Sequence, residues 1–326
     1  MPCTLPSSSD LESESIAYKV MRTVWVPWQR ERRIVREHER IQATRRSAWL
    51  DAGYYHAAVL RHDGGVACWG RNTDDGQAPP DGVDGDFVAV AAGGRHSLAL
   101  RRNGNVACWG RYGYGRAPPD GVDGDFVAIA AGGVYSLALR RNGSVACWGY
   151  NDDGQAPPDG VEGDFVAIAA GDRHSLALRR NGSLACWGDN DDGQAPPDGV
   201  EGDFVAIAAG DQHSLALRRN GSLACWGPND EGQAPPDGVE GDFVAIAAGG
   251  AHSLALTRNG NVACWGYNNY GQAPPDGVEG DFVAIGAGTY FSVALRRDGS
   301  VACWGSNAYG QAPPAGVHGP FKTSEV

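Results

Sequence analysis

The chain has 326 residues and a formal net charge of −12, and residues 47–326 carry 18 Lys or Arg against 33 Asp or Glu, a balance of −15. Such an acidic body repels phosphate backbones, which disfavours nucleic acid as its ligand. No run of 18 apolar residues is present, so the sequence predicts no membrane-spanning helix and no membrane partner.

The first 46 residues differ from the rest, because they hold nine Lys or Arg against six acids. Residues 1–18 are rich in Ser and acid and show no apolar period, which predicts disorder. Residues 29–41 have the charged composition of a helix, and their arginines fit either a solvated helix or a patch for nuclear import or an acidic partner. We expect residues 1–46 to form an N-terminal extension, disordered at first and then helical and charged.

The remainder of the chain is a repeat. A Cys-Trp-Gly triplet recurs with one step of 40 residues and five of 39, a period typical of repeat architectures. Seven copies occupy residues 47–320 and leave residues 321–326 as a C-terminal tail. The triplets begin at Cys68, Cys108, Cys147, Cys186, Cys225, Cys264 and Cys303.

Each repeat predicts short strands, as residues 204–242 illustrate. Residues 204–209 are rich in Ala, which favours a crowded innermost strand; residues 213–217 and 223–227 follow as the second and third strands. Asn220-Gly221 between the last two predicts a two-residue type I′ hairpin turn. The paired prolines Pro235 and Pro236 lack N–H donors, so they indicate an extended edge segment.

Sheets this small must stack on their neighbours. The predicted fold is therefore all-β, a seven-bladed β-propeller with repeats of 39–40 residues and three to four short antiparallel strands per blade. The pattern of the first strand occurs eight times, with degenerate copies at residues 47–52 and 321–326. We expect the first copy to complete the first blade and the last copy to lie at the periphery.

Seven of the eight cysteines share one repeat position, and Cys3 is the eighth. Equivalent positions in neighbouring blades lie too far apart for a disulfide. Free thiols predict a reducing compartment, and residues 1–15 lack the apolar core of a secretory signal. We therefore expect a cytoplasmic or nuclear protein.

The repeat resembles that of the RCC1 (regulator of chromosome condensation) family in the pattern Ala-Gly-x-x-His-Ser-Leu-Ala-Leu, followed by Gly-x-Val-x-x-Trp-Gly-x-Asn-x-x-Gly-Gln. The resemblance implies a seven-bladed propeller. It covers activities as different as nucleotide exchange on a nuclear small GTPase, ultraviolet-B photoreception, service as a module of ubiquitin ligases, and β-lactamase inhibition. The short period is most similar to that of the inhibitor, whose blades are mainly three-stranded.

The chain departs from several of these relatives. The photoreceptor places Trp and then Arg before the repeat His, whereas the pairs here include Gly94-Arg95 and Asp172-Arg173 and never contain Trp. The exchange factor contacts its GTPase through an inserted β-wedge, and the repeats here are too short to hold one. The inhibitor is secreted, and no export signal is evident here.

In such a propeller the loops after the first and third strands open on one face, and the positions that vary between repeats lie almost entirely in those loops. Tyr and Arg with interspersed Asp are typical of protein-recognition surfaces, although drift at positions free of packing is the alternative explanation. The predicted partner-binding residues are Tyr54, Tyr55, Arg95, Tyr112, Tyr114, Tyr150, Arg173, Asp189, Tyr267, Tyr270, Tyr290 and Tyr309.

The same pattern argues against chemistry. The histidine column holds Tyr135 and Phe291 at two of its positions, so we expect a structural column and no metal site. The Asp-rich loops lack the bidentate Glu of a calcium loop. No nucleophile, base and orienting residue stand at distinct positions, so we expect neither an enzyme nor a cofactor. The sequence favours a monomeric scaffold for an unidentified protein partner, with guanine-nucleotide exchange or enzyme inhibition as alternatives.

Overall fold

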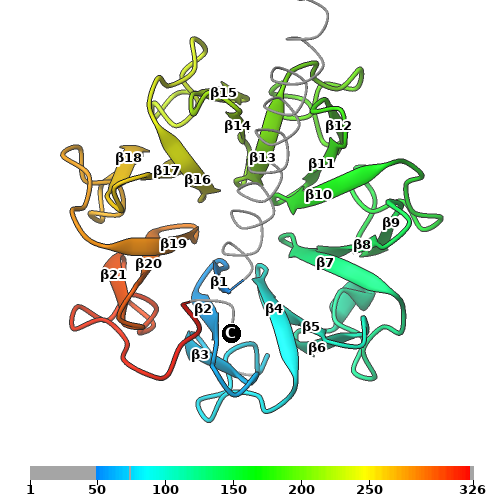
Figure 1. Ribbon diagram of the computed structural model, residues 1–326. Coiled ribbons are helices and arrows are strands. Elements are labelled where there is room, and N and C mark those ends of the chain that lie inside the picture. Colours follow the sequence, from blue (N-terminus) through cyan, green and yellow to red (C-terminus); the bar gives the residue numbers. More distant parts are fainter. Residues whose placement is uncertain (1–48, 73–74, 324–326) are drawn as a thin grey trace, which may run out of the picture. The chain divides into compact units, whose positions relative to one another are not determined.

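The structure is a computed structural model that describes residues 49–72 and 75–323; the predictions for residues 1–46 lie outside that range. Seven separate sheets, each of three antiparallel strands in chain order, form the blades of a ring (Figure 1). The predicted all-β, seven-bladed propeller is confirmed. Figure 1 shows the first strand of each blade pointing toward the centre.

The blades are numbered in chain order. Blade 1 holds β1 (Leu50–Ala52), β2 (His56–Leu60) and β3 (Val66–Gly70); blade 2 holds β4 (Phe87–Ala92), β5 (His96–Arg101) and β6 (Val106–Gly110). Blade 3 holds β7 (Phe126–Ala131), β8 (Tyr135–Arg140) and β9 (Val145–Gly149); blade 4 holds β10 (Phe165–Ala170), β11 (His174–Arg179) and β12 (Leu184–Gly188). Blade 5 holds β13 (Phe204–Ala209), β14 (Ser214–Arg218) and β15 (Leu223–Trp226); blade 6 holds β16 (Phe243–Ala248), β17 (His252–Thr257) and β18 (Val262–Gly266). Blade 7 holds β19 (Phe282–Ala287), β20 (Phe291–Arg296) and β21 (Val301–Gly305), and the 3-10 helix η2 (Gly113–Gly115) follows β6.

The turn between the second and third strands differs from the predicted type I′. In blade 2 the Gly104 N–H donates to the Arg101 carbonyl at 3.0 Å, while the Arg101 N–H donates to the Asn105 carbonyl at 2.8 Å. Gly104 has φ +94°, and Asn103 is not among the described residues with positive φ. A type I′ turn needs positive φ at both central residues, so this is a three-residue loop, a type I turn closed by a glycine in the left-handed region.

The proline pair also behaves differently from the predicted extended edge. The Gly238 N–H donates to the Pro235 carbonyl at 2.9 Å, which closes a turn, and Val239 then bridges Leu223 on the third strand. Prolines supply no donors to an edge, so the single valine makes the outermost pairing. Each blade thus has three strands and a one-residue bridge in place of a fourth strand.

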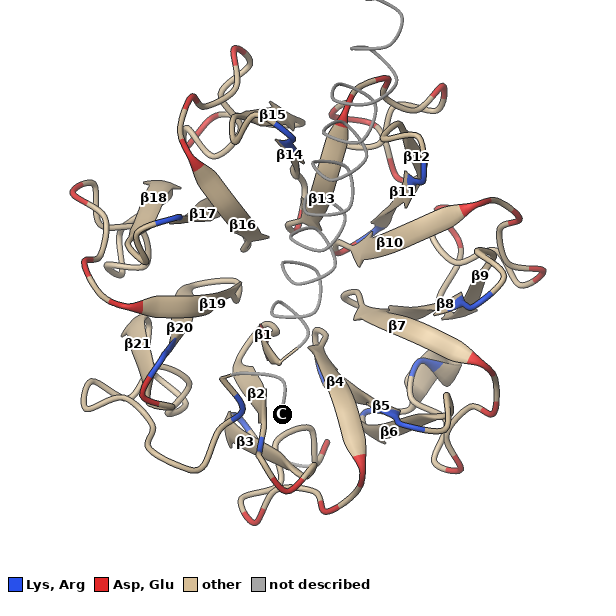
Figure 2. Cartoon of the chain, viewed as in Figure 1, with Lys and Arg blue, Asp and Glu red and all other residues tan. Residues whose placement is uncertain are grey.

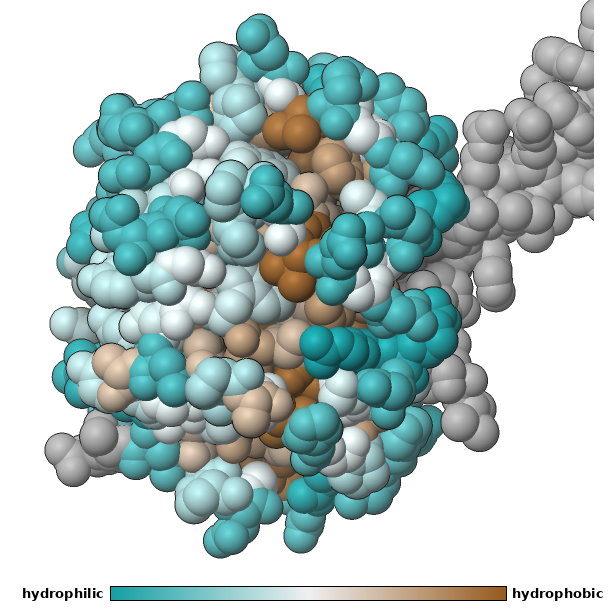
Figure 3. Space-filling model, turned by 90° about the vertical axis from the view of Figure 1, so that its left-hand side faces the viewer, coloured by the Kyte–Doolittle hydropathy of each residue, from teal (hydrophilic) through white to brown (hydrophobic). Residues whose placement is uncertain are grey.

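The hydrophobic core lies between blades. One buried cluster joins Leu176, Leu178 and Cys186 of blade 4 to Phe204 and Ala216 of blade 5. Because each blade covers the face of the next, no sheet needs to bury both faces alone. Figure 3 shows the outside of the ring around β16–β18, where hydrophobic residues are recessed between hydrophilic ones.

A polar latch repeats between neighbouring blades. His174 Nε2 lies 2.9 Å from Ser214 Oγ of the next blade, and that hydroxyl donates to the Gln194 carbonyl at 2.8 Å. The Trp226 Nε1–H donates to the same carbonyl at 2.8 Å. The predicted structural role of the histidine column is therefore confirmed for its five histidines, each of which contacts a serine of the next blade through Nε2. They are His56, His96, His174, His213 and His252.

The ring closes with segments from both ends of the repeat region. As expected, the first copy of the strand pattern forms β1 of blade 1. The expectation that the last copy is peripheral is wrong for Phe321, which is 3% exposed and packs in the cluster that joins blades 7 and 1. Phe321 bridges Arg61, and the Lys322 N–H donates to the Leu60 carbonyl at 2.9 Å. In the other six blades a phenylalanine begins the first strand, whereas blade 1 has none in its own strand. Phe321 takes that position in blade 1.

The face that carries the hairpin turns is called the connector face here. Acidic residues lie at the outer starts of β7, β10 and β16 on it (Figure 2), and some pair with arginines of the turns. Arg258 Nε lies 3.0 Å from Asp242 Oδ2, and Arg297 Nε lies 3.0 Å from Asp281 Oδ2. These pairs are exposed, so each stabilises the fold by only about 0.2–1 kcal/mol.

Candidate functional site

The two variable loops of each blade lie side by side. In blade 2 the Arg111 N–H donates to the Arg95 carbonyl at 2.8 Å, and in blade 6 the Tyr267 N–H donates to the Ala251 carbonyl at 2.8 Å. These bonds join the loop after the first strand to the loop after the third strand. The two sets of loops together are called the variable face.

A constant frame holds these loops while the residues within them change. The Ala273 N–H donates to Asn268 Oδ1 at 2.8 Å, and the Tyr270 N–H donates to Gln272 Oε1 at 3.0 Å. The same asparagine bond recurs at Asn72, Asn151, Asn190, Asn229 and Asn307. The Asn recurs in six repeats, and only blade 2 has Tyr112 there and Arg116 at the Gln position. Where they occur, the Asn and Gln fix the loop backbone, which leaves the intervening positions free to carry recognition side chains.

Three tyrosines of blades 6 and 7 form one cluster. The Tyr270 and Tyr290 ring centroids are 5.4 Å apart, and both rings also pack against Tyr267. Tyr270 is nevertheless 54% exposed. Edge-to-face packing restricts each ring, so this patch is a rigid aromatic surface open to solvent.

A second aromatic group spans the junction of blades 7 and 1. Tyr55 and Tyr309 pack edge to face at 5.3 Å, and the Arg71 guanidinium lies 5.0 Å from the Tyr309 centroid. A third group joins blades 2 and 3, where Tyr114 packs on Tyr150 at 5.2 Å. Tyr112 beside it is 73% exposed. Eight of the nine predicted tyrosines therefore lie in these groups on the variable face, five of them exposed and three partly buried.

The predicted charged residues lie among these groups. Arg95 Nη1 is 3.6 Å from Asp75 Oδ2 of the neighbouring blade, and Arg173 Nη1 is 3.8 Å from Asp153 Oδ2. The Asp189 carboxylate accepts the Asp191 N–H at 3.1 Å, which shapes its own loop. The structure thus brings all three onto the variable face without joining them into one cluster.

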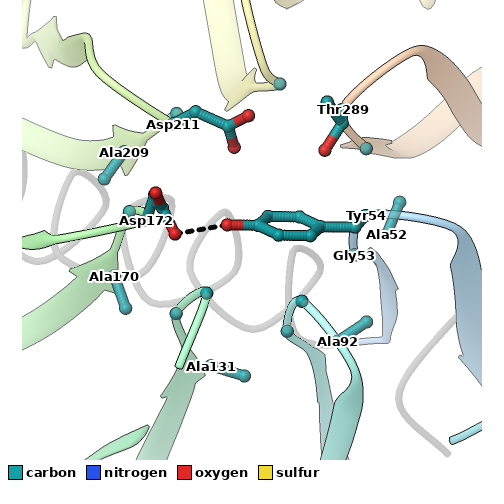
Figure 4. Close-up of a pocket in the computed structure, with 18 of the residues that line it drawn as sticks. Ala52, Gly53, Tyr54, Ala92, Ala131, Ala170, Asp172, Ala209, Asp211 and Thr289 are labelled. Atoms are coloured by element: carbon teal, nitrogen blue, oxygen red, sulfur yellow. Dashed lines mark hydrogen bonds between the residues drawn. The ribbon is translucent and has the colours of Figure 1, made fainter. Parts of the chain in front are cut away.

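Tyr54 has a different position from the other tyrosines. It lies over the ring axis, where its hydroxyl donates to Asp172 Oδ1 from across the ring (Figure 4). Burial and the nearby Asp211 and Asp172 carboxylates raise the pKa of Tyr54. Its hydrogen bond is therefore internal, and its side chain crosses the centre of the ring toward blade 4.

The axis is narrow there because glycines of successive blades meet. A Cβ on Gly210 would lie 2.4 Å from the Gly249 carbonyl oxygen, and the Asp211 N–H donates to that same oxygen at 3.2 Å. Tyr54 also lines a cavity of about 50 Å³ into which Asp211 and Thr289 point (Figure 4). Burial, and then the Asp172 charge, raise the pKa of Asp211 to about 7.

The sequence interpretation missed this axial group. Asp172, Asp211 and Thr289 all directly follow the axial glycine of their repeats, and that shared position was the available signal. The first strands also line a wider axial space of about 670 Å³ with small apolar side chains such as Ala128, Ala169 and Ile246. The innermost placement predicted for the Ala-rich strand is confirmed.

Comparisons with known proteins agree with this architecture. The family model described as Regulator of chromosome condensation (RCC1) repeat matches residues 50–77, 87–116, 126–155, 165–194, 204–233, 243–272 and 282–311. A comparison of the chain with curated proteins finds no match. Among the described residues, no helix is long and apolar enough to span a bilayer.

Several solved structures share the fold. Prp20p from Saccharomyces cerevisiae, described with its binding to Gsp1p and histones, is 23% identical with a TM-score of 0.62, over 75% of this chain and 81% of that one. The ectodomain of the Arabidopsis thaliana receptor kinase ACR4 is 23% identical with a TM-score of 0.66, over 82% and 98%. The ectodomain of the Physcomitrella patens receptor kinase CR4 is 27% identical with a TM-score of 0.63, over 79% and 73%.

Proposed function

The chain belongs to the regulator of chromosome condensation (RCC1) repeat family, and on that premise we propose that it is a rigid, non-enzymatic scaffold that binds a protein partner through its variable face. The observation that carries the proposal is the gathering of exposed tyrosines into packed groups on that one face. Tyr270 and Tyr290 are 54% and 38% exposed while in contact with each other. Rigid aromatic rings bind with little loss of conformational entropy.

The frame beneath the tyrosines supports the same function. The Asn268 and Gln272 side chains hold the loop that carries Tyr267 and Tyr270, and the His252–Ser292 bond joins the blades 6 and 7 from which the tyrosine loops extend. A surface that is already ordered loses less conformational freedom on association. Drift alone explains variation between repeats, but it does not explain why the aromatic side chains contact one another across blade boundaries.

The buried reactive groups support a binding role over catalysis. Burial raises the pKa of Cys186 to about 12 and lowers the pKa of His174 to about 4. At neutral pH the thiol is protonated and the imidazole is already engaged with Ser214. Neither group is placed to act as a nucleophile or a general base on a substrate at the variable face.

One structure that shares the fold supports a protein as the partner. Prp20p is described as binding Gsp1p and histones, which fits a protein as the partner here.

Guanine-nucleotide exchange on a small GTPase is the second candidate function, and release of a fluorescent GDP analogue from purified GTPases tests it. A screen of enzyme activities in the presence of the purified chain tests the inhibitor alternative.

Affinity capture with paired variants tests the proposal. The test variant changes Tyr112, Tyr114, Tyr267 and Tyr270 to Ala, and the control variant changes Arg141, Arg180 and Arg219 on the connector face to Ala. Thermal melts establish that both variants are folded. We expect a partner that the wild-type chain and the control retain and that the tyrosine variant loses. Equal recovery on all three chains would exclude the variable face as the binding surface.

A further inference from the structure

Charge is distributed unevenly over the variable face. The loops of blades 3, 4 and 5 hold nine acids and one arginine, whereas those of blades 6 and 7 hold no charged residue. The set in blades 3 to 5 is called the acidic sector here. Its acids are Asp152, Asp153, Asp172, Asp189, Asp191, Asp192, Asp211, Asp230 and Glu231, and its arginine is Arg173.

Most of this negative charge is not neutralised within the part of the chain that the structure describes. Arg173 lies 3.8 Å from Asp153 and 3.7 Å from Asp172, so one guanidinium serves two carboxylates. No ion pair between described residues involves the remaining acids of the sector. Asp191, Asp192 and Asp230 are exposed. Like charges at this density repel one another, and a cationic ligand relieves that repulsion.

The inner edge of the acidic sector reaches the axial cavity. Asp211 and Thr289 point into it (Figure 4), and the buried Thr289 Oγ1 has no hydrogen-bond partner among residues 49–72 and 75–323. A carboxylate and a hydroxyl are acceptors for the three N–H donors of a lysine ammonium. The cavity volume of about 50 Å³ is suited to the small head of one side chain and not to a larger ligand.

The other edge of the sector adjoins the aromatic cluster. Blade 6 follows blade 5 in the ring, and its Tyr267 and Tyr270 stand beside Tyr290 of blade 7. Aromatic faces attract cations and also pack against the aliphatic stems of Lys and Arg. The acidic loops and the tyrosine cluster therefore favour the same class of ligand from adjacent positions.

We propose that the partner is recognised through a basic, extended polypeptide segment that crosses the acidic sector, directs one lysine toward Asp211 and Thr289, and rests its next residues on the tyrosine cluster of blades 6 and 7. This inference rests on the proposed function and names the chemistry of its partner. Charge complementarity selects the occupant, because an acidic segment or a phosphate backbone would meet the same carboxylates with repulsion.

Fluorescence anisotropy with defined probes tests this. The probes are three labelled peptides of the same length, with repeats of Lys-Gly-Ser, Arg-Gly-Ser and Glu-Gly-Ser. The test variant is Asp189→Asn/Asp191→Asn/Asp192→Asn. The control is Asp125→Asn/Asp164→Asn/Asp203→Asn, which removes the same charge from exposed positions of blades 3 to 5 on the connector face.

We expect the Lys peptide to bind the wild-type chain and the control alike, with affinity that falls as salt is added, and the Glu peptide not to bind. The test variant should bind the Lys peptide about tenfold more weakly. Asp211→Asn should weaken the Lys peptide more than the Arg peptide, because the cavity fits the smaller ammonium. Equal weakening by the test and control variants would mean attraction by net charge alone and would overturn the proposal.

The outcomes separate this inference from the proposed function. If the tyrosine variant loses its captured partner but no basic peptide binds the wild-type chain, the variable face is a binding surface and the basic segment is wrong. If the tyrosine variant keeps its partner, the proposed function itself is wrong.

Discussion

Phe291 and Ala57 lie in one buried cluster at the seam between blades 7 and 1, at the positions where five of the other six junctions place a histidine and a serine. At those five junctions the pair is joined through His Nε2 and Ser Oγ, as in His252 and Ser292 at 2.9 Å, and between blades 3 and 4 the Ser175 Oγ–H donates to the Tyr135 hydroxyl. Phe291 and Ala57 suit each other, because a phenyl ring has no N–H that needs an acceptor and an alanine methyl group needs no hydrogen-bond partner. The seam is thus stabilised by apolar packing where the other junctions use a polar latch.

The Phe291 and Ala57 pair predicts that a His–Ser pair at another junction can be replaced by Phe and Ala together. His174→Phe combined with Ser214→Ala recreates the Phe291 and Ala57 pair at the junction of blades 4 and 5. We expect the double variant to fold with a change in unfolding free energy of about 1 kcal/mol, because a buried hydrogen-bonded pair replaced as a pair is nearly neutral. Ser214→Ala alone should cost more, since it leaves the His174 N–H without an acceptor. Urea titration compares them, and a double variant less stable than both single variants would contradict the pairing.

The histidines make the fold sensitive to acid. Each serine of these pairs donates its Oγ–H to the backbone carbonyl of a glutamine or arginine. The His Nε2–H is therefore the donor to the serine oxygen. The five His Nδ1 atoms have no hydrogen-bond partner among the described residues. Burial lowers the pKa to about 4 for His56 and His174 and to about 3 for His96, His213 and His252. The unfolded chain therefore binds more protons below its histidine pKa of about 6.5.

It follows that stability is full above about pH 6.5 and is lost as the pH falls from there toward 4. Each histidine contributes a slope of about 1.4 kcal/mol per pH unit. The double variant at His174 and Ser214 should show a shallower loss between pH 6.5 and 4.5 than the wild type. Chemical denaturation at a series of pH values measures this, and an unfolding free energy that stays constant over that range would contradict it.

Asp211 should have the opposite pH dependence. Its folded pKa is raised to about 7 from an ordinary value of 3.8, so the folded state binds the extra proton between those values and stability is lost as the pH rises through 7. Asp211→Asn removes the buried charge. We expect a higher melting temperature than wild type at pH 8 and no gain at pH 4. A variant that is stabilised equally at both values would show that the carboxylate is not the cause.

Phe321 should be required for ring closure. It is 3% exposed and packs in the cluster that includes Phe291 and Val301. Phe321→Ala should lower the unfolding free energy by about 3–5 kcal/mol, as for other buried phenylalanines. His318→Ala, an exposed position on the same segment, is the control. Denaturant titration measures both, and a Phe321→Ala chain as stable as the control would place the residue outside the core.

The sequence was sufficient for the blade but not for every contact within it. The spacing of the Cys-Trp-Gly triplets predicts the ring, and the five histidines of the His column are structural as expected. The turn type was missed because Asn-Gly is common to two kinds of hairpin loop, and only the backbone angles separate them. Phe321 was missed because its five following residues do not match the repeat, while the phenylalanine alone completes blade 1.

The variable face was predictable from topology, and its internal organisation was not. Alternation of strand direction places the loops after first and third strands together. That Tyr54 turns inward to Asp172 depends on residues 118 positions apart in sequence, which meet only when the ring closes. The grouping of Tyr267, Tyr270 and Tyr290 likewise depends on the angle between two blades.

Hydrogen–deuterium exchange of the chain with and without its captured partner tests the central claim most directly. We expect slowed exchange in the variable loops, above all at residues 267–270 and 289–290 of the tyrosine cluster and 189–192 of the acidic sector, with the hairpin turns of the connector face unchanged. Protection confined to the connector face, with the variable loops exchanging as in the free chain, would contradict it.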